Sequence, residues 1–597
     1  MRHLGSFRMY ESVIRELAVR GHDIHLALDR GAWLALGSRP ALENLVAEYP
    51  RVTWSRLSPS TSPLWFDLAG TIRLWVDYLR YFLPEYDATP KLKARAEDRV
   101  PPKLVRISNW RLFQQAANRH RLLAVLRALE RALPPVPQIE RQLEEARPDV
   151  VLVTPLVYLG SSQFDTLRTA LSMGLRTAFC VGSWDHLSSK ALIRDLPDRV
   201  LVWNETQKDE AVRLQGVPPE RVVVTGAQCY DHWFGRRPVR SREDFCQRVG
   251  LPTDRRFLLY VCSALFPGSP VEAEFVRRWV QSLRESAHAE LRSVAVLVRP
   301  HPARTAEWNT VDLAPFKHVR LYGSNPVDDT SKDDYFESLF YSSAVVGMNT
   351  SAFLEAAVVD RPVHTILLPE FHENQEGTLH FQYLSTVGGG VLLAGRSFEA
   401  HHAQLLESLR RAPGQAGTNP QFVREFIRPH GLDTRATPIF CDAVDDLLRM
   451  PAPAPEWTPL RFRLLRVAMV PTFLLLRWIY GSEVVCDDRH LRERERRRQR
   501  QEHRRKREER LRSAEAKTRQ QARVRAQTLT AREAAVRAKQ VERQRAEAEK
   551  AVQKGERARA KTARVREKGR VVLRARLKRG ASRWLSRWRP GQEGQVR

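Results

Sequence analysis

The sequence has 597 residues, of which 43% are hydrophobic; this length excludes a single hydrophobic core and predicts three or four domains. No run of eighteen apolar residues occurs, which argues against a membrane-spanning helix, and the six scattered cysteines have neither metal-site nor disulfide spacing, as is typical of a reducing cytosol. The net charge of +29 is uneven: residues 491–597 hold 38 Lys and Arg against 13 Asp and Glu, so a polycationic tail follows a nearly neutral body.

The first 240 residues alternate between helical and strand patterns. Apolar residues at helical spacing run from Ser6 to Arg20, and Gly21 follows, a residue type that commonly ends helices. A strand is expected at Ile24–Leu28, and residues 60–145 are expected to be mostly helical. Further strands are expected at Val150–Thr154, Thr177–Val181, Val200–Trp203 and Val222–Thr225. These patterns predict an N-terminal Rossmann-like domain over residues 1–240.

Residues 241–450 repeat this pattern. Strands are expected at Phe257–Cys262, Val294–Val298, Val319–Tyr322, Ala344–Gly347, Val363–Leu368 and Val391–Leu393. Apolar β-branched runs separated by helices predict parallel strands that are covered on both faces. We therefore expect an α/β protein in which two Rossmann-like parallel-sheet domains face a cleft.

The C-terminal part has two further segments. Residues 451–486 begin as a Pro-rich linker and continue as an amphipathic apolar segment, which is expected either to lie in a membrane interface or to pack on the preceding domain. Residues 487–597 are rich in Arg, Glu and Ala but lack an apolar heptad, so a basic tail is expected, either helical or disordered. Near its end, apolar residues recur at near-helical spacing among arginines, which is typical of a membrane-surface segment: Leu573, Leu577, Trp584, Leu585 and Trp588.

The segment from Ala344 to Leu368 is predicted to form a strand, a turn, a helix and a second strand. Asn349, Thr350 and Ser351 are residue types that cap helix N-termini. Such a helix start directs unpaired N–H groups and a positive dipole end toward the crevice above a parallel sheet, where a diphosphate binds. Glu355, about one turn further, is placed to reach a ribose hydroxyl. The alternative is an ordinary capped helix with no ligand.

Arg299 and His301 follow a predicted strand in the sequence Arg-Pro-His-Pro. They are therefore expected at the carboxyl edge of the second sheet, where open α/β domains bind ligands. Their side chains suit phosphate oxygens or a leaving group. The alternative for His301 is a structural histidine with satisfied hydrogen bonds.

A second polar loop follows the strand predicted to end at Val181. Within it, Asp185 is a candidate general base for a hydroxyl nucleophile, and Trp184 could stack on a sugar. Lys190 could hold an anion, and Ser188 and Ser189 complete the predicted acceptor side of the cleft. The alternative is a capped loop around a packed tryptophan.

Two histidines complete the candidate site. His3 precedes the first helix and is a second candidate base, and His380 lies in a polar loop that is expected to contact the donor sugar. His372 and His380 are poorly spaced as metal ligands, and no metal site is expected. The chain also lacks Gly-x-Gly-x-x-Gly and the phosphate-loop lysine motif.

With these residues, the chain resembles the GT-B superfamily of nucleotide-sugar glycosyltransferases, in its bacterial surface-polysaccharide branch near CDP-glycerol glycerophosphotransferases and UDP-N-acetylglucosamine 2-epimerases. The resemblance rests on the segment from Leu17 to His25, on Arg299 to Pro302 and on Asn349 to Pro362, and it covers roughly residues 1–445. It implies an acceptor-binding first domain and a second domain that binds the donor through Arg299, His301, Asn349, Thr350, Ser351 and Glu355, with neither cofactor nor metal.

The resemblance also raises a question about the first residues, because proteins of this superfamily begin with a buried strand before the first helix. This chain starts with Met1, Arg2 and His3 and shows no strand pattern upstream of the helix. A start codon assigned too late is the expectation that follows, and an intact mass of the native protein would test it.

Three functions compete at this stage. The first is a cytoplasmic glycosyltransferase, peripheral at the inner face of the plasma membrane, that moves a sugar from a nucleotide-sugar to a cell-surface glycan or lipid-linked acceptor. The second is a related glycerophosphotransferase or sugar-nucleotide epimerase. The third is a nucleic-acid-binding or scaffold protein that acts through its tail. The terminal tryptophans favour an anionic membrane surface as the partner of the tail over nucleic acid.

Overall fold

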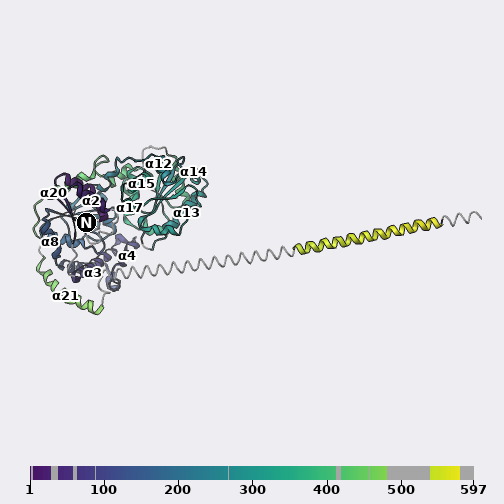
Figure 1. Cartoon of the computed structure of the whole chain (residues 1–597). Coiled ribbons are helices and arrows are strands. Elements are labelled where there is room, and N and C mark those ends of the chain that lie inside the picture. The colour runs from purple at the N-terminus through teal and green to yellow at the C-terminus, as the bar shows by residue number, and fades with distance from the viewer. Residues whose placement is uncertain are drawn as a thin grey trace, which may run out of the picture. The chain divides into compact units, whose positions relative to one another are not determined.

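The computed structural model describes residues 1–577 except 2–3, 29–37, 58–62, 88, 267, 412–418, 456–457 and 481–537. The chain divides into a compact unit, Met1–Arg492, and a second unit, Glu493–Arg597. Figure 1 labels several of the helices described below.

The compact unit begins with helices and a small parallel sheet. A 3-10 helix, η1 (Leu4–Met9), precedes α1 (Glu11–Val19), where a single helix was predicted. β1 (Ile24–Leu28) matches its prediction and pairs in parallel with β2 (Val52–Arg56), which the sequence analysis missed; α2 (Ser38–Glu48) joins them. The amino group of Met1 donates a hydrogen bond to the carbonyl of Ala27 over 2.7 Å.

Helices fill the predicted helical region between β2 and the next sheet. They are α3 (Pro63–Arg80), η3 (Pro84–Tyr86), α4 (Pro90–Glu97), α5 (Pro102–Ser108), α6 (Arg111–Gln114), α7 (Ala116–Ala132) and α8 (Pro137–Ala146). Proline at the first position of α3, α4, α5 and α8 fits the helix start, where its missing N–H is not needed.

The second sheet is parallel and has the strand order β3-β4-β5-β6. Its strands are β3 (Val150–Val153), β4 (Arg176–Cys180), β5 (Arg199–Val202) and β6 (Val222–Val224), and each overlaps its prediction. The elements between and after them are α9 (Gln163–Ser172), α10 (His186–Ser189), α11 (Glu205–Arg213), η4 (Pro219–Arg221), η5 (Gln228–Trp233) and α12 (Arg242–Val249).

The third sheet has six parallel strands in the order β12-β11-β10-β7-β8-β9. They are β7 (Phe257–Val261), β8 (Ala295–Arg299), β9 (Val319–Leu321), β10 (Ala344–Val346), β11 (Val363–Ile366) and β12 (Leu392–Gly395). Helical elements alternate with them: α13 (Glu272–Arg284), α14 (Ala289–Ser293), η6 (Pro302–Asn309), α15 (Asp329–Phe340), α16 (Ala352–Val358), η7 (Pro369–Asn374), α17 (Leu379–Thr386), η8 (Val387–Gly389), α18 (Phe398–Arg410) and α19 (Pro420–Phe426).

Both faces of this sheet are buried, as the apolar runs predicted. In β7, Leu259 packs into one hydrophobic cluster and Leu258 and Tyr260 pack into another, because neighbouring residues of a strand point to opposite faces. Every residue of β7 and β8 is buried. The predicted fold class, α/β with parallel sheets, is confirmed.

The chain then returns to its first half. α20 (Ala436–Arg449) packs Phe440, Cys441 and Val444 into the cluster that contains Tyr10 and Ile14 near the N-terminus. α21 (Leu460–Tyr480) follows, and in the second unit residues 538–577 form a helix in which all but one of the described residues are exposed. No helix among the described residues is both long and apolar enough to cross a membrane.

Candidate functional site

Two predicted motifs lie at the carboxyl edge of the six-stranded sheet. β8 ends at Arg299 and β10 ends just before Gly347, and both strands pair with β7. Two strand spacings separate the motifs by roughly 10 Å. Gly347 is required here, because a Cβ atom would lie 2.8 Å from the carbonyl oxygen of Val261 at the end of β7.

Arg299 is more enclosed than its predicted role suggests. Only 4% of the residue is exposed, and its guanidinium donates hydrogen bonds to the carbonyls of Asp334 and Ser324. It also lies 5.1 Å from the ring centre of Tyr335. Burial lowers the pKa of Arg299, so the surroundings stabilise its charge only in part.

His301 is half-buried at the start of η6. Its Nδ1 accepts a hydrogen bond of 3.2 Å from the backbone N–H of Ala303, which places the proton of the neutral ring on Nε2. Burial, and then the charge of Arg304, lower its pKa, so the ring is neutral near pH 7. A neutral ring of this tautomer can donate one hydrogen bond to a ligand.

The triplet that precedes α16 is held by its backbone and by one amide. The backbone N–H of Asn349 donates to Ser263 Oγ over 3.1 Å, and its side-chain Nδ2 donates to the carbonyl of Asn374 over 2.6 Å. Thr350 Oγ1 accepts from the N–H of Ala352, whereas Ser351 is exposed and its side chain caps nothing. The predicted helix is present, with seven residues.

Glu355, the predicted ribose contact, interacts electrostatically with Arg8, a residue that the sequence analysis missed. Burial raises the pKa of Glu355 to about 7, while a hydrogen bond donated by Tyr335 and the charge of Arg8 act in the opposite direction. Arg8 belongs to η1 in the first half and is exposed. Arg8 lies in no recognisable sequence motif. Only the folded structure shows that its positive charge acts on Glu355.

The Asp185 loop follows β4 in the first half and carries an internal ion pair. Lys190 Nζ lies 2.9 Å from Asp185 Oδ2, and Ser183 and Ser189 donate hydrogen bonds to the same carboxylate. Burial opposes ionisation of this carboxyl, but Lys190, His380, His186 and Ser183 together hold its pKa well below the usual range. About one fifth of each side chain of the pair stays exposed.

Helices α3 and α4 fix the backbone of this loop. Arg80, which is fully buried, donates to the carbonyls of Leu187, Lys190 and Ala191. Tyr81 donates to the carbonyls of Ser189 and Lys190, and Arg95 of α4 also donates to that of Ser189. The segment that carries the predicted acceptor-side residues is therefore built against the helical region.

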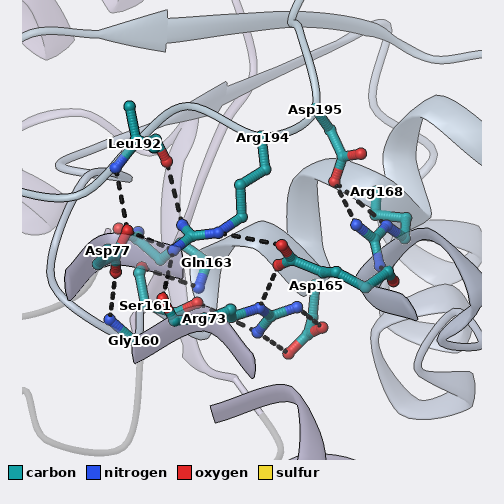
Figure 2. Close-up of polar contacts among 11 residues, drawn as sticks. Arg73, Asp77, Gly160, Ser161, Gln163, Asp165, Arg168, Leu192, Arg194 and Asp195 are labelled. Atoms are coloured by element: carbon teal, nitrogen blue, oxygen red, sulfur yellow. Dashed lines mark hydrogen bonds and ion pairs between the residues drawn. The ribbon is translucent and has the colours of Figure 1, made fainter. Parts of the chain in front are cut away.

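A buried network of charges holds the same face of α3 further along the helix (Figure 2). Arg73 lies 2.9 Å from Glu130 of α7 and 2.6 Å from Asp165 of α9. Asp77 accepts hydrogen bonds from Arg194 and from the backbone N–H of Leu192. These contacts connect α3, α7 and α9 with the segment that follows the Asp185 loop.

The two halves meet at the predicted site residues. The ring centres of Trp184 and His380 are 4.8 Å apart at an interplanar angle of 89°, and Asn349 Nδ2 lies 3.5 Å from His380 Nε2. Burial is the main cause that lowers the pKa of His380 to about 4, so this ring is neutral. The loop after β4 and the edge after β10 therefore share a junction.

This junction is tightly packed. Trp184 and His380 are each 6% exposed, and Ser188 and Ser189 are almost completely buried. Trp184 already packs on a histidine, so a sugar that stacked on it would need the two halves to separate locally. The two halves also meet where the hydroxyl of Tyr383 in α17 donates a hydrogen bond of 2.8 Å to Glu210 in α11. Burial raises the pKa of Glu210 to about 7.

Two further predictions concern His3 and metal binding. His3 lies outside the described residues, so its place is not described. Among the described residues, no group of three His, Cys, Asp or Glu side chains is arranged to hold a metal ion.

Comparisons with known proteins give only distant likenesses. No family model and no curated protein matches the chain. Among solved structures, the UDP-GlcNAc 2-epimerase from Methanocaldococcus jannaschii is 12% identical over 74% of this chain and 96% of its own, with a TM-score of 0.42. A putative UDP-N-acetylglucosamine 2-epimerase from Listeria monocytogenes is 12% identical over 76% and 98%, also at 0.42. WaaG, a glycosyltransferase involved in lipopolysaccharide biosynthesis, is 12% identical over 76% and 98%, at 0.37.

At these identities and TM-scores, the likenesses carry no statement about activity. The fold is defined by its own topology: three parallel sheets, of two, four and six strands, with helices between the strands.

Proposed function

We propose that the chain is a glycosyltransferase of GT-B type that moves a sugar from a nucleotide-sugar to a cell-surface glycan or lipid-linked acceptor. The observation that supports this most is the junction of Trp184 with His380, because it brings the loop after β4 against α17, whose His380 also lies 3.5 Å from Asn349 at the carboxyl end of β10. Open α/β domains bind their ligands at such strand ends.

On the donor side, the diphosphate lies near the backbone N–H groups of Thr350 and Ser351, with the exposed Arg8 of η1 as a cation. Arg299 is held by two carbonyls and acts mainly through its charge, and neutral His301 donates a hydrogen bond from Nε2 to a phosphate oxygen. Glu355, with a pKa of about 7, can bind a ribose hydroxyl in either protonation state.

On the acceptor side, Asp185 is the proposed base. It is ionised at neutral pH, partly exposed and fixed by Lys190, so it accepts the hydrogen bond of an acceptor hydroxyl without prior deprotonation. The hydroxyl oxygen forms the new bond to the anomeric carbon while the bond to the nucleoside diphosphate breaks. The hydroxyl proton passes to Asp185, and cationic groups neutralise the leaving diphosphate.

A panel of nucleotides tests the donor site in the full-length protein. Thermal unfolding is followed with UDP, GDP, CDP and dTDP, and one of them is expected to raise the Tm because it binds only the folded state. In Glu355→Ala that shift is expected to shrink, and the fully exposed Asp329→Ala is the matched control. Absence of a shift with every nucleotide, at millimolar concentration, would overturn the proposal.

Product analysis separates the related reactions. Incubation with a UDP-sugar alone yields an epimer only if the enzyme is an epimerase, whereas transfer requires an acceptor and releases the nucleoside diphosphate. CDP-glycerol as donor identifies a glycerophosphotransferase. Release of nucleoside diphosphate that depends on an acceptor glycan is the expected result.

The proposed location is cytoplasmic and peripheral, at the inner face of the plasma membrane, with the tail at the anionic lipid. It is supported by 38 Lys and Arg against 13 Asp and Glu in residues 491–597 and by the exposure of the helix at 538–577. Flotation with anionic vesicles beside duplex DNA binding tests this, and tail-dependent DNA binding without lipid binding would favour the nucleic-acid alternative.

A further inference from the structure

Helix α21 has two apolar faces, and only one of them is packed. Met469 and Phe473 are 7% and 5% exposed and lie in one hydrophobic cluster with residues of α3 and α7 (Figure 1). Arg466 donates to the carbonyl of Ala132, at the end of α7, over 2.6 Å. The sequence left open whether this segment packs on the preceding domain or lies in a membrane interface. In the structure, the face of α21 that carries Met469 and Phe473 is packed.

The opposite face is apolar and exposed. Its side chains lie on one side of the helix in two groups, one before and one after Pro471, here called together the α21 stripe: Leu460 (71% exposed), Leu464 (64%), Val467 (72%), Leu474 (49%), Leu475 (53%) and Trp478 (83%). Isolated exposed apolar residues are common, but such a stripe indicates an interaction surface.

The charges around the α21 stripe have one sign. α21 contains four arginines and neither Asp nor Glu. Its neighbour α7 contains four arginines and one acid, Glu130, which is buried and paired with Arg73. The two neighbouring helices thus carry an exposed apolar stripe and an excess of arginines, of which Arg461 and Arg463 of α21 are exposed.

An anionic lipid surface is complementary to this combination of exposed apolar side chains and arginines. A helix of 21 residues lies along a surface for about 30 Å. Its apolar side chains reach the acyl boundary while flanking arginines remain at the level of anionic headgroups. Arg466 and Arg477 also interrupt the apolar segment, which agrees with lying on a bilayer rather than crossing it.

We propose that the α21 stripe docks the compact unit on an anionic lipid bilayer, independently of the basic tail. The stripe enters the interface, and the exposed Arg461 and Arg463 of α21 supply positive charge to the headgroups. Lipid binding therefore has an apolar component from the stripe and an electrostatic component from the arginines and the tail.

The test uses the full-length protein, with the tail intact. Sedimentation with vesicles of phosphatidylcholine and phosphatidylglycerol at 7:3 is compared for the wild type, for Leu464→Ser/Val467→Ser/Trp478→Ser and for the control Val239→Ser/Leu321→Ser, whose side chains are exposed outside α21. Measurements at low salt and at about 0.5 M salt separate the components, because salt screens the tail and not the stripe.

The stripe variant is expected to lose at least tenfold in vesicle partitioning at high salt, with an unchanged Tm, and the control is expected to bind like the wild type. Equal binding of the stripe variant and the wild type at high salt would overturn the proposal. It would also be overturned if light scattering showed a wild-type dimer that the stripe variant loses while vesicle binding is unchanged, because a second copy would then cover the stripe.

Discussion

At the residue scale, the structure separates carboxyl groups that look alike in the sequence. Burial raises the pKa values of Glu210, Glu272 and Glu355 to about 7, whereas Lys190 and its neighbours hold that of Asp185 far lower. The difference comes from the partners, since Asp185 faces an ammonium group and the three glutamates face mainly hydroxyl and backbone groups. Because its pKa is the lowest of the four, Asp185 is the carboxyl group that is ionised at neutral pH and can act as the base.

Replacing Glu210 by Gln is expected to change the pH dependence of stability. The folded pKa of about 7 lies above the ordinary value of 4.5, so the folded protein keeps a proton that the unfolded chain has released. Stability therefore falls as pH rises from about 4.5 to 7. At pH 8 the variant is expected to be more stable than the wild type by about 2–3 kcal/mol, and at pH 4 nearly equal.

Urea unfolding at both pH values measures this difference. Glu205→Gln, on the same helix and exposed, is the control and is expected to show no such effect. If Glu210→Gln changed stability equally at both pH values, the proton would not be held by this carboxyl.

Asp185→Asn tests the proposed base directly. The amide keeps the shape of the side chain but cannot accept a proton, so kcat for transfer is expected to fall by about 10²- to 10⁴-fold. The nucleotide-dependent Tm shift is expected to remain, because the donor residues lie on the other sheet. Because the pKa of Asp185 is well below its usual range, wild-type activity is expected to show no loss from its protonation above pH 5. A variant with wild-type kcat would exclude Asp185 as the base.

At the element scale, α3 connects the helical region to the candidate site. Its Arg73 and Asp77 join the buried charges shown in Figure 2, and its last residue, Arg80, binds carbonyls of the Asp185 loop together with Tyr81, which follows the helix. Its apolar residues, among them Ile72 and Val76, share one hydrophobic cluster with residues of α7 and α21. The proposed lipid contact and the loop that carries the proposed base are thus attached to one helix.

Arg80→Met is expected to destabilise the protein by about 2–4 kcal/mol, because the three hydrogen bonds from its buried guanidinium to carbonyls of the loop are lost. Chemical unfolding measures the loss, and limited proteolysis is expected to cut first near residues 186–191. Arg39→Met, at an exposed ion pair, is the control with little effect. If Arg80→Met were as stable as Arg39→Met, the loop would be held by other contacts.

At the scale of the whole compact unit, the chain returns to the first half through α20. Phe440 is 1% exposed and meets Tyr10 edge to face at 6.1 Å, and the hydroxyl of Tyr10 donates to the carbonyl of Cys180. The last helix of the second half therefore completes the core of the first. Its loss should affect the first half and not the six-stranded sheet.

Phe440→Ala is expected to cost about 3–5 kcal/mol, the usual cost of removing a buried aromatic ring. Hydrogen exchange is expected to quicken in α1 and β5 more than in β7 and β8. Val239→Ala, at an exposed valine, is the matched control. Uniform acceleration across both halves would indicate that they unfold as one cooperative unit instead.

Most strands could be predicted because each is a short apolar run between polar turns. β2 was missed, since Val52–Arg56 alternates with polar residues and lies beside charged segments. The split between η1 and α1 at Tyr10 was also missed, because the apolar spacing of Phe7, Tyr10 and Val13 continues through it without interruption. Of the candidate site, the positions after β4, β8 and β10 were predicted, whereas Arg8, Arg80 and Glu210 were not, because no local pattern marks them.

The sequence by itself determined where the strands and helices lie, which motifs follow strand ends, and that a cationic tail follows a nearly neutral body, since these depend on local periodicity and composition. Only the tertiary structure decided that Trp184 meets His380, that Glu210 keeps its proton near neutrality and that one apolar face of α21 is left exposed. Burial and electrostatic shifts arise from contacts between residues distant in the chain, and such contacts exist only once the elements have packed.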